Sequence, residues 1–314
     1  MRYVTIKELS DIIRRNLWKI PHDVDCVVGI PRSGMLPASM IALYLNTNLC
    51  DVESFLNGRC FEIGQSRPYM MRHNTIKKVL IVDDSVGAGG SMTQAKEKLK
   101  TVGNEYEFIF LAPIVTSIGE KYVDIFFEII DESRIFEWNL FHHYFLENAC
   151  FDLDGVLCCD PIIDDDGEQY VHFLETAVPL FIPTAQINTI ITCRLEKYRK
   201  QTEAWLTKYN INYKKLVMLD MPTKAARIKW GKHGEYKGEY YKKSECHLFI
   251  ESSLHQARII ADISGKDVIC IETNSIITSR MLEHKIKKRL SFWLPNSFIE
   301  NYRKIKAKFY YKRL

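Results

Sequence analysis

The chain reads Val79-Leu80-Ile81-Val82-Asp83-Asp84-Ser85-Val86-Gly87-Ala88-Gly89-Gly90-Ser91 where a short apolar run passes into a loop of small residues. The apolar run predicts a buried strand over 78–82, and a helix is expected over 91–102. Small residues let backbone N–H groups converge on a phosphate, and the dipole at the N-terminus of the following helix attracts the same charge. This stretch therefore predicts a phosphate site on an α/β scaffold.

The polar side chains of this loop suit a phosphorylated sugar. Ser85 and Ser91 can donate hydroxyl hydrogen bonds, whereas Asp83 and Asp84 can accept from sugar hydroxyls or hold Mg²⁺. The loop lacks the Lys-Ser/Thr end of the Gly-rich triphosphate loop. Its carboxylates precede its glycines, which also excludes the dinucleotide fingerprint.

Residues 79–92 resemble the phosphoribosyl-pyrophosphate (PRPP) signature of the type I phosphoribosyltransferases. The resemblance implies that Asp83 and Asp84 contact the ribose hydroxyls, with Asp84 also a Mg²⁺ ligand. It implies that the 5-phosphate is held by Ser85, Gly87, Ala88, Gly89, Gly90 and Ser91. An upstream run is similar to the family's pyrophosphate loop, in which the binding residues would be Gly29, Arg32, Ser33 and Gly34.

Two further parts of this family's site are less well defined here. Residues 57–75 correspond in position to the mobile catalytic loop, and the sequence does not choose among Arg59, Arg67 and Arg72 as the group that assists pyrophosphate departure. An acceptor pocket would have to come from residues 1–22 and 131–146. The aromatic side chains of that second range fit a domain interface at least as well.

A second acidic turn follows the apolar run Ala149-Cys150-Phe151 and reads Asp152-Leu153-Asp154-Gly155-Val156-Leu157. Two carboxylates on one side of a tight turn can attack phosphorus and move protons, with Mg²⁺ between them. The further acids of a calcium-binding EF-hand loop are missing.

This turn resembles motif I of the haloacid-dehalogenase (HAD) phosphatases, which implies Asp152 as nucleophile and Asp154 as general acid/base. Later motifs are found in the same order, with Thr192 as the phosphoryl-binding hydroxyl and Lys237 as the motif III lysine, rivalled by Lys232 and Lys242. Glu251 would complete the Mg²⁺ ligands with Asp152 and Asp154, although Ser252 stands where the family usually has a second acid. About 40 residues separate Asp152 from Thr192, too few for a large cap domain.

Strands alternate with helices along both halves, which predicts two α/β domains, each a mainly parallel sheet flanked by helices. We expect a phosphoribosyltransferase domain over 1–146, a capless HAD-like Rossmannoid phosphatase domain over 147–280 and a basic aromatic tail over 281–314. The 314 residues are enough for two such cores. The tail holds ten Lys/Arg against two Glu and so carries a charge of +8. Since the whole chain carries +4, residues 1–280 together carry −4. The tail fits an anionic membrane surface or a polyanion, or equally a solvated helix docked through its aromatic face.

The composition indicates a soluble cytoplasmic protein. The basic tail would also allow peripheral contact with the inner membrane face. No apolar run approaches the ~20 residues that span a bilayer, and the first residues lack an apolar signal core. The nine cysteines show no disulfide or metal spacing, so reduced thiols are expected. A nucleic-acid partner is not expected, and the oligomeric state is left open.

The order of the two motifs favours a bifunctional enzyme. It would transfer 5-phosphoribose from PRPP to an acceptor and then hydrolyse the 5-phosphate, leaving a ribofuranosyl unit. The combination is similar to PRPP-dependent ribofuranosyl transfer in bacterial surface-glycan biosynthesis, which implies a lipid-linked glycan acceptor. The alternatives are nucleobase salvage coupled to a nucleotide phosphatase, and a PRPP-sensing regulator.

Overall fold

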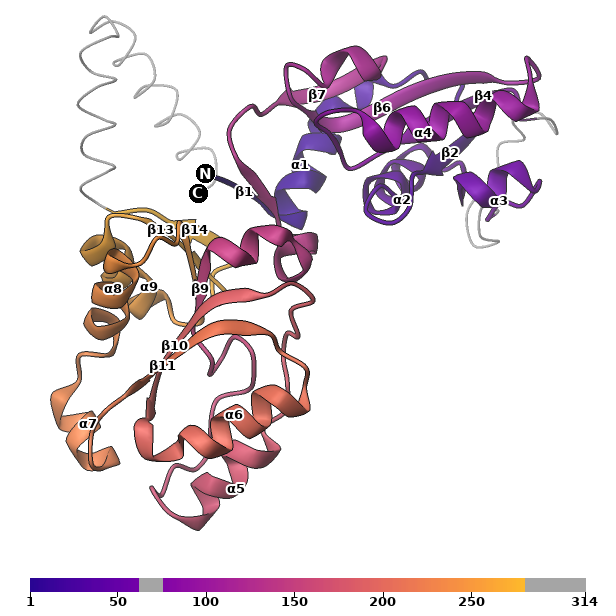
Figure 1. Ribbon diagram of the computed structural model, residues 1–314. Helices are drawn as coiled ribbons and strands as arrows, with labels where there is room; N and C mark the ends of the chain where they lie inside the picture. The colour runs from indigo at the N-terminus through magenta and orange to yellow at the C-terminus, as the bar shows by residue number, and fades with distance from the viewer. Residues whose placement is uncertain (62–75, 280–314) are drawn as a thin grey trace, which may run out of the picture. The chain divides into compact units, whose positions relative to one another are not determined.

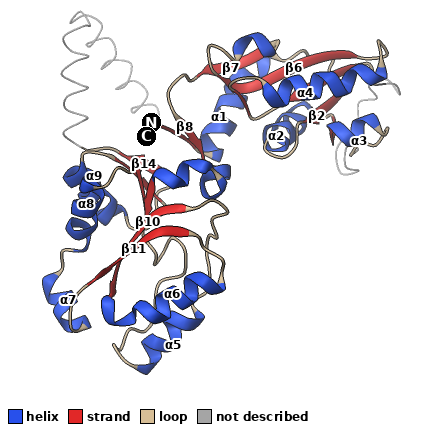
Figure 2. Cartoon of the chain, viewed as in Figure 1, coloured by secondary structure: helices blue, strands red, loops and turns tan. Residues whose placement is uncertain are grey.

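The computed structural model describes residues 1–61 and 76–279, and these residues form two compact units (Figure 1). The first unit is Met1–Trp138, and the second begins at Asn139. Each unit contains one large sheet with helices on it (Figure 2). Within these described ranges, none of the helices combines the length and apolar character that a membrane crossing needs.

The first unit is built on a parallel sheet in which β3-β2-β4-β6-β5 lie in that order and β7 pairs with β6. The central strands are buried on both faces, which explains their unbroken apolar sequences. The strands are β2 (Cys26–Gly29), β3 (Asn48–Asp51), β4 (Lys78–Val82), β5 (Ser85–Val86), β6 (Glu107–Val115) and β7 (Ile125–Ile129).

Four helices cover this sheet, and two separate apolar clusters show which face each one covers. α1 (Ile6–Asn16) and α2 (Met35–Leu45) contribute to one cluster with Leu80 and Val82. α3 (Val52–Leu56) and α4 (Gly90–Leu99) contribute to the other. The predicted fold class, a parallel sheet with helices on both faces, is confirmed for this unit.

The order of the strands fixes where a ligand can bind. The connection from β2 runs outward to β3, and β4 then returns to the other side of β2 before β6 and β7 extend the sheet away from it. The helices that follow these strands, α2 and α4, therefore lie on opposite faces of the sheet, and the loops after β2 and β4 meet at a topological switch point at the carboxyl ends of these strands. Both predicted binding loops of this unit, 29–34 and 83–91, lie at that edge.

A small parallel sheet, which the sequence analysis did not predict, pairs β1 (Arg2–Val4) with β8 (Arg134–Phe136). Strands of three residues carry too little apolar periodicity to be recognised. Short 3₁₀ helices complete the regular structure: η1 (Leu17–Lys19), η2 (Lys100–Val102), η3 (Glu120–Tyr122), η4 (Glu137–His142), η5 (Tyr144–Asn148) and η6 (Glu196–Tyr198).

The second unit has the sheet order β11-β10-β9-β12-β13-β14, parallel except for β14. Its strands are β9 (Ala149–Phe151), β10 (Ile187–Leu195), β11 (Tyr213–Leu219), β12 (Leu248–Glu251), β13 (Asp267–Cys270) and β14 (Ser275–Ile277). Here the chain moves outward from β9 to β11 and then returns to the far side of β9 as β12. The switch point therefore lies between β9 and β12, where Asp152 and Glu251 are found.

The helices of this unit are α5 (Glu168–Thr176), α6 (Arg199–Lys208), α7 (Lys224–Trp230), α8 (His233–Lys243) and α9 (Leu254–Ser264). α8 was not predicted, because glycine inside a helix costs ~1 kcal/mol relative to alanine. Its glycines have a packing role, since a Cβ at Gly234 would lie 2.9 Å from Ile259 and one at Gly238 would lie 3.1 Å from Ile263. These close approaches hold α8 against α9.

Candidate active sites

The paired carboxylates after β4 are buried, with Asp83 7% and Asp84 8% exposed. Local hydrogen bonds fix both: the backbone N–H of Asp84 donates to Asp83 Oδ1 (2.9 Å), and that of Ser85 donates to Asp84 Oδ1 (2.8 Å). The indole Nε1–H of Trp138 donates to Asp84 Oδ2 at 2.7 Å. Asp84 is therefore held from both sides.

Burial raises the pKa of both carboxyl groups. For Asp83 the neighbouring charge of Asp84 adds to the effect, and the pKa rises to about 7. Burial also raises the pKa of Asp84, although the hydrogen bonds from Trp138 and Ser85 oppose it. Simultaneous ionisation of these two adjacent carboxyl groups is unfavourable. A bound cation, or hydroxyl groups that donate hydrogen bonds, would stabilise their charged form.

The loop of small residues leads directly into α4. Gly89 has φ +80°, and a Cβ there would lie 2.4 Å from the ring of Tyr122, so only glycine fits. Ala88, Gly90 and Ser91 are exposed at the beginning of α4. The unpaired N–H groups of this helix end therefore face solvent where the sequence predicts a phosphate.

The loop after β2 packs against the acidic loop. The N–H of Ile30 donates to the carbonyl of Val82 (2.8 Å), and a Cβ on Gly34 would lie 2.7 Å from that carbonyl oxygen and 3.0 Å from Cα of Asp83. The Pro31–Arg32 peptide bond is cis, and the Arg32 side chain is exposed. The structure thus brings the two predicted loops together at the switch point.

Arg134 adds a cation that the sequence analysis named only as part of the range 131–146. Its Nη2 lies 3.3 Å from the position of a Cβ on Gly87, beside the small-residue loop. Burial lowers the pKa of Arg134, whereas Asp84 and Asp131 raise it. Among the arginines considered for pyrophosphate departure, Arg59 is exposed, and Arg67 and Arg72 lie outside the described residues.

In the second unit, a buried lysine joins two carboxylates from neighbouring strands. Lys237 Nζ donates to Asp152 Oδ2 (2.7 Å) and to Glu251 Oε2 (2.8 Å). Lys237 is 2% exposed, whereas Lys232 and Lys242 are exposed on the surface. The geometry therefore places Lys237, and neither rival, against Asp152.

The charges of this triad depend on one another. Burial alone would lower the pKa of Lys237, but Asp152 and Glu251 outweigh it, and the pKa is raised. Burial raises the pKa of Asp152, against the opposing effect of Lys237. The amine therefore stays protonated and compensates the carboxylates that would otherwise be buried without a counter-ion.

Glu251 is fully buried, and its other oxygen, Oε1, accepts from the N–H of Ser253 (3.1 Å) and the hydroxyl of Ser252 (3.3 Å). A carboxylate has about four lone-pair sites, so Glu251 keeps acceptor capacity for a cation. Gly155, at φ +72°, passes so close to Ser252 that a Cβ would lie 2.6 Å from it. The loops after β9 and β12 are thereby packed together.

Asp154 has a partner that sequence reasoning missed. Arg194 donates through Nη2 to Asp154 Oδ1 (2.6 Å) and through Nε to Oδ2 (3.0 Å). Arg194 is 1% exposed, and its backbone N–H donates to the Thr192 hydroxyl at 3.2 Å. The strand β10 thus supplies both the predicted hydroxyl and the cation that orients Asp154.

A cavity of about 180 Å³ collects these groups. Of the predicted residues, Asp152, Asp154, Thr192 and Lys237 line it, whereas Glu251 is bonded to Lys237 without lining the cavity. Asp160 also lines it, and burial together with Asp154 and Glu251 raises the pKa of this carboxyl. The unpredicted lining residues are Asp160, Pro161, Tyr170, Cys193, Arg227, His233, Ser252 and Gln256. Asp160, Pro161 and Ser252 come from the segments after β9 and β12, and Cys193 lies near the end of β10. The other four residues belong to α5, α7, α8 and α9, and no local signal in the sequence marks them.

The fold and loops of the first unit define a class, the open parallel α/β domains whose binding loops meet at a topological switch point. Within that class, residues 2–145 match the family described as "Phosphoribosyl transferase domain". This match supports a phosphoribosyltransferase domain in this part of the chain, and PRPP as its substrate is consistent with that family.

Solved structures similar to the chain include a purine phosphoribosyltransferase from Pyrococcus horikoshii (20% identity, 44% of this chain and 92% of that chain, TM-score 0.33). Another is a xanthine-guanine-hypoxanthine phosphoribosyltransferase from Helicobacter pylori (15%, 44% and 92%, TM-score 0.34). A third is an orotate phosphoribosyltransferase from Aeropyrum pernix (22%, 37% and 62%, TM-score 0.27). No curated protein matches the chain.

Proposed function

We propose that the chain is bifunctional: residues 1–146 transfer 5-phosphoribose from PRPP to an acceptor, and residues 147–280 then remove the 5-phosphate as a HAD-type phosphatase. The observation that carries the second half is the buried bridge from Lys237 to Asp152 and Glu251. The ammonium group of Lys237, held between two carboxylates at the switch point of the sheet, would attract an anionic phosphate ester. Asp152, bonded to the same ammonium group, would then attack the phosphorus.

In the transfer step, the bond from C1 of the ribose to pyrophosphate breaks while an acceptor oxygen bonds to C1 and releases its proton to solvent, and pyrophosphate leaves. Asp83 and Asp84 would hold the ribose hydroxyls, and the N–H groups that begin α4 would bind the 5-phosphate together with Ser85, Gly87, Ala88, Gly89, Gly90 and Ser91. Gly29, Arg32, Ser33 and Gly34 would face the pyrophosphate. Arg134, a half-buried cation, lies beside Gly87 of this loop.

In the hydrolytic step, a carboxylate oxygen of Asp152 attacks phosphorus and the ester P–O bond breaks, with Asp154 giving its proton to the leaving oxygen. Water then attacks the aspartyl phosphate, Asp154 takes the proton, and inorganic phosphate leaves. Thr192 and Lys237 would hold the phosphoryl oxygens. Arg194 orients Asp154 for both proton transfers.

The donor sets of both sites fit Mg²⁺. Asp83 and Asp84 in one site, and Asp152, Glu251 and the half-buried Asp154 in the other, offer carboxylate oxygens whose mutual repulsion a divalent cation would relieve. Bound there, Mg²⁺ would neutralise charge on pyrophosphate in the first site and on the phosphoryl group in the second.

A large acceptor, such as a lipid-linked glycan, is favoured by the surroundings of the second site. A groove of about 630 Å³ shares Asp160 with the acidic cavity and is lined by Ile162, Ile163, Phe173 and Val178. Ile162 is 99% exposed. The basic tail, residues 281–314, lies outside the described residues, and its charge of +8 would suit an anionic membrane surface.

The test is mass analysis of products formed from PRPP and Mg²⁺ with a panel of acceptors, including synthetic lipid-linked saccharides and free nucleobases. A pentosyl adduct on a saccharide supports the proposal, and an adduct on free bases alone overturns the glycan acceptor. Asp152→Asn should leave the adduct one phosphate heavier. The matched control is Asp220→Asn, an exposed carboxylate just after β11, which should yield the dephosphorylated product.

A double variant separates the two domains. Asp83→Asn with Asp84→Asn should abolish adduct formation, while the same protein still releases phosphate from the phosphorylated adduct made by Asp152→Asn. Dephosphorylated product from Asp152→Asn itself would show that the second site is misassigned.

A further inference from the structure

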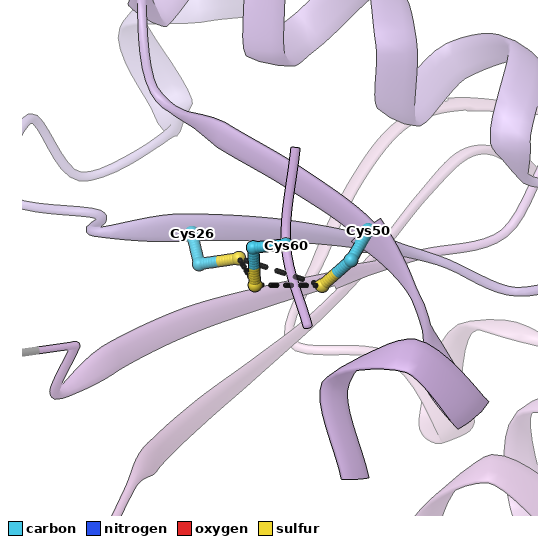
Figure 3. Close-up of side chains that lie close together, drawn as sticks. All are labelled: Cys26, Cys50 and Cys60. Carbon is cyan, nitrogen blue, oxygen red and sulfur yellow. Dashed lines mark hydrogen bonds between the residues drawn. The ribbon is translucent and has the colours of Figure 1, made fainter. Parts of the chain in front are cut away.

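Three cysteine thiols meet at the edge of the first sheet (Figure 3). They come from the first residue of β2 (Cys26), from β3 (Cys50) and from the segment after α3 (Cys60). The Sγ atoms of Cys26 and Cys50 are 3.8 Å apart, those of Cys26 and Cys60 are 3.8 Å apart, and those of Cys50 and Cys60 are 3.3 Å apart.

The backbone explains why these thiols converge. In the parallel pair β2–β3, Val28 lies opposite Cys50, and Cys26 is two residues before Val28 and so on the same face. Leu49 and Phe61 exchange two backbone hydrogen bonds as an antiparallel bridge. Cys50 and Cys60 are the next residues along this bridge and therefore lie opposite each other at close range.

The separations match those in a metal–thiolate site. With Zn–S bonds of about 2.3 Å, two ligands of a tetrahedral zinc ion are about 3.8 Å apart. Two of the three separations have that value, and the third is 0.5 Å shorter by comparison of the two distances. We propose that Cys26, Cys50 and Cys60 bind a Zn²⁺ ion through their three sulfur atoms, with a fourth position left for water or another ligand.

Binding is a balanced exchange of protons for metal. Each thiol loses its proton to solvent as its sulfur bonds to zinc, and no electrons are transferred. Three thiolates and one Zn²⁺ have a net charge of −1. The same thiolates with a monovalent cation would have a larger net negative charge. This favours Zn²⁺ over Cu⁺ in a site bordered by Val28, Val52 and Phe55.

The exposure of the three ligands suits a structural metal with a route of entry. Cys26 and Cys50 are fully buried, whereas Cys60 is half-buried and opens the site to solvent. Cys26 begins β2, whereas Cys50 lies opposite Val28, one residue before the loop that starts at Gly29. The proposed ion would therefore tie the Cys60 segment to β2 and β3.

The competing use of the same cluster is a disulfide. Cys50 and Cys60 form a cross-strand pair of the kind that a disulfide can bridge, but such a bond would leave Cys26 as a third thiol beside it. Metal binding uses all three. The two uses exclude each other, so one experiment separates them.

The experiment titrates the reduced full-length protein with Zn²⁺ against a chromophoric chelator, and then with Co²⁺ to read the coordination geometry from its spectrum. We expect one ion per chain and sulfur-to-cobalt charge-transfer bands with tetrahedral d–d intensity. Cys60→Ser changes the half-buried ligand and should weaken binding at least ~10-fold, since even an outer partner of a ligand costs that much. Cys159→Ser, a half-buried thiol of the second unit, should leave binding unchanged.

Alkylation gives a second readout that needs no variant. Zn²⁺ should slow the modification of Cys60 by iodoacetamide several-fold and leave Cys159 unaffected. Absence of stoichiometric binding, or binding that survives in Cys60→Ser, overturns the proposal. A Cys50–Cys60 disulfide in protein that binds no zinc after reduction also overturns it. None of these outcomes depends on enzymatic activity, so they stand apart from the proposed function.

Discussion

Arg194 and Asp154 form a two-point ion pair in which Nη2 and Nε of the guanidinium donate to the two carboxylate oxygens at 2.6 and 3.0 Å. The arginine side chain is fully buried, and the carboxylate is 21% exposed at the cavity. A planar guanidinium that holds both oxygens leaves the carboxylate one orientation. The proposed proton-transfer group is therefore positioned by β10, the strand that also carries Thr192.

Arg194→Lys should reduce phosphate release by ~10–100-fold in kcat with a smaller change in KM. A lysine keeps the positive charge but cannot donate to both oxygens in a fixed plane, so Asp154 loses its orientation for proton transfer. Steady-state phosphate release from the phosphorylated adduct measures this effect. The control is Arg199→Lys, which alters a partly exposed ion pair with Glu196 and Glu203 and should leave kcat unchanged. Equal kcat values for Arg194→Lys and wild type would contradict the positioning role.

Lys237→Met should lower the free energy of unfolding by about 3 kcal/mol, because it leaves Asp152 and Glu251 buried without their cation. Lys242→Met, at an exposed position five residues later on α8, should change it by less than ~0.5 kcal/mol. Urea denaturation without Mg²⁺ measures both. Adding Glu251→Gln to Lys237→Met should recover part of the loss, since one buried charge is then removed. If the two lysine variants are equally stable, the bridge is not a stabilising contact.

The sequence predicted those parts of the structure whose signals are local. The strand Lys78–Val82 and the loop after it were recognised because an unbroken apolar run, two acids and three glycines follow one another directly. The acids Asp152 and Glu251 were likewise found at the ends of apolar strands. The choice of Lys237 over Lys232 and Lys242 needed the structure, because it depends on which face of α8 packs inward.

The contacts that sequence reasoning missed join residues far apart in the chain. Arg194 meets Asp154 across 40 residues, and Trp138 meets Asp84 across 54. The three cysteines have no metal-ligand spacing, and only the β2–β3 register and the Leu49–Phe61 bridge bring them together. Such pairs depend on the tertiary arrangement of strands, which periodicity within a short window does not encode.

Trp138→Phe should raise the KM for PRPP several-fold while leaving the fold intact. Phenylalanine preserves the stacking on Phe136, whose ring centroid is 4.8 Å away, but it removes the donor to Asp84. That hydrogen bond lowers the pKa of Asp84, so its loss should shift the acidic limb of the kcat/KM profile for PRPP to higher pH. Initial rates at a series of pH values measure the shift. Trp18→Phe is the matched control, because this indole is 74% exposed on the surface. An unchanged profile would show that Trp138 only packs.

Asp83→Asn should stabilise the protein at neutral pH and abolish phosphoribosyl transfer. Burial, and then the charge of Asp84, raises the pKa of Asp83 from 3.8 to about 7, so the folded state holds a proton that the unfolded chain releases. The free energy of unfolding should therefore fall as pH rises from about 4 to 7. Asparagine needs no proton at that position, so the thermal melting temperature of the variant should fall less over this range. The largest advantage over wild type is expected above pH 7. Asp11→Asn serves as the control and should follow the wild-type curve, because this half-exposed carboxylate on α1 has only a solvent-accessible ion pair with Arg14. A wild-type curve parallel to that of Asp83→Asn would mean that Asp83 is already ionised in the folded protein.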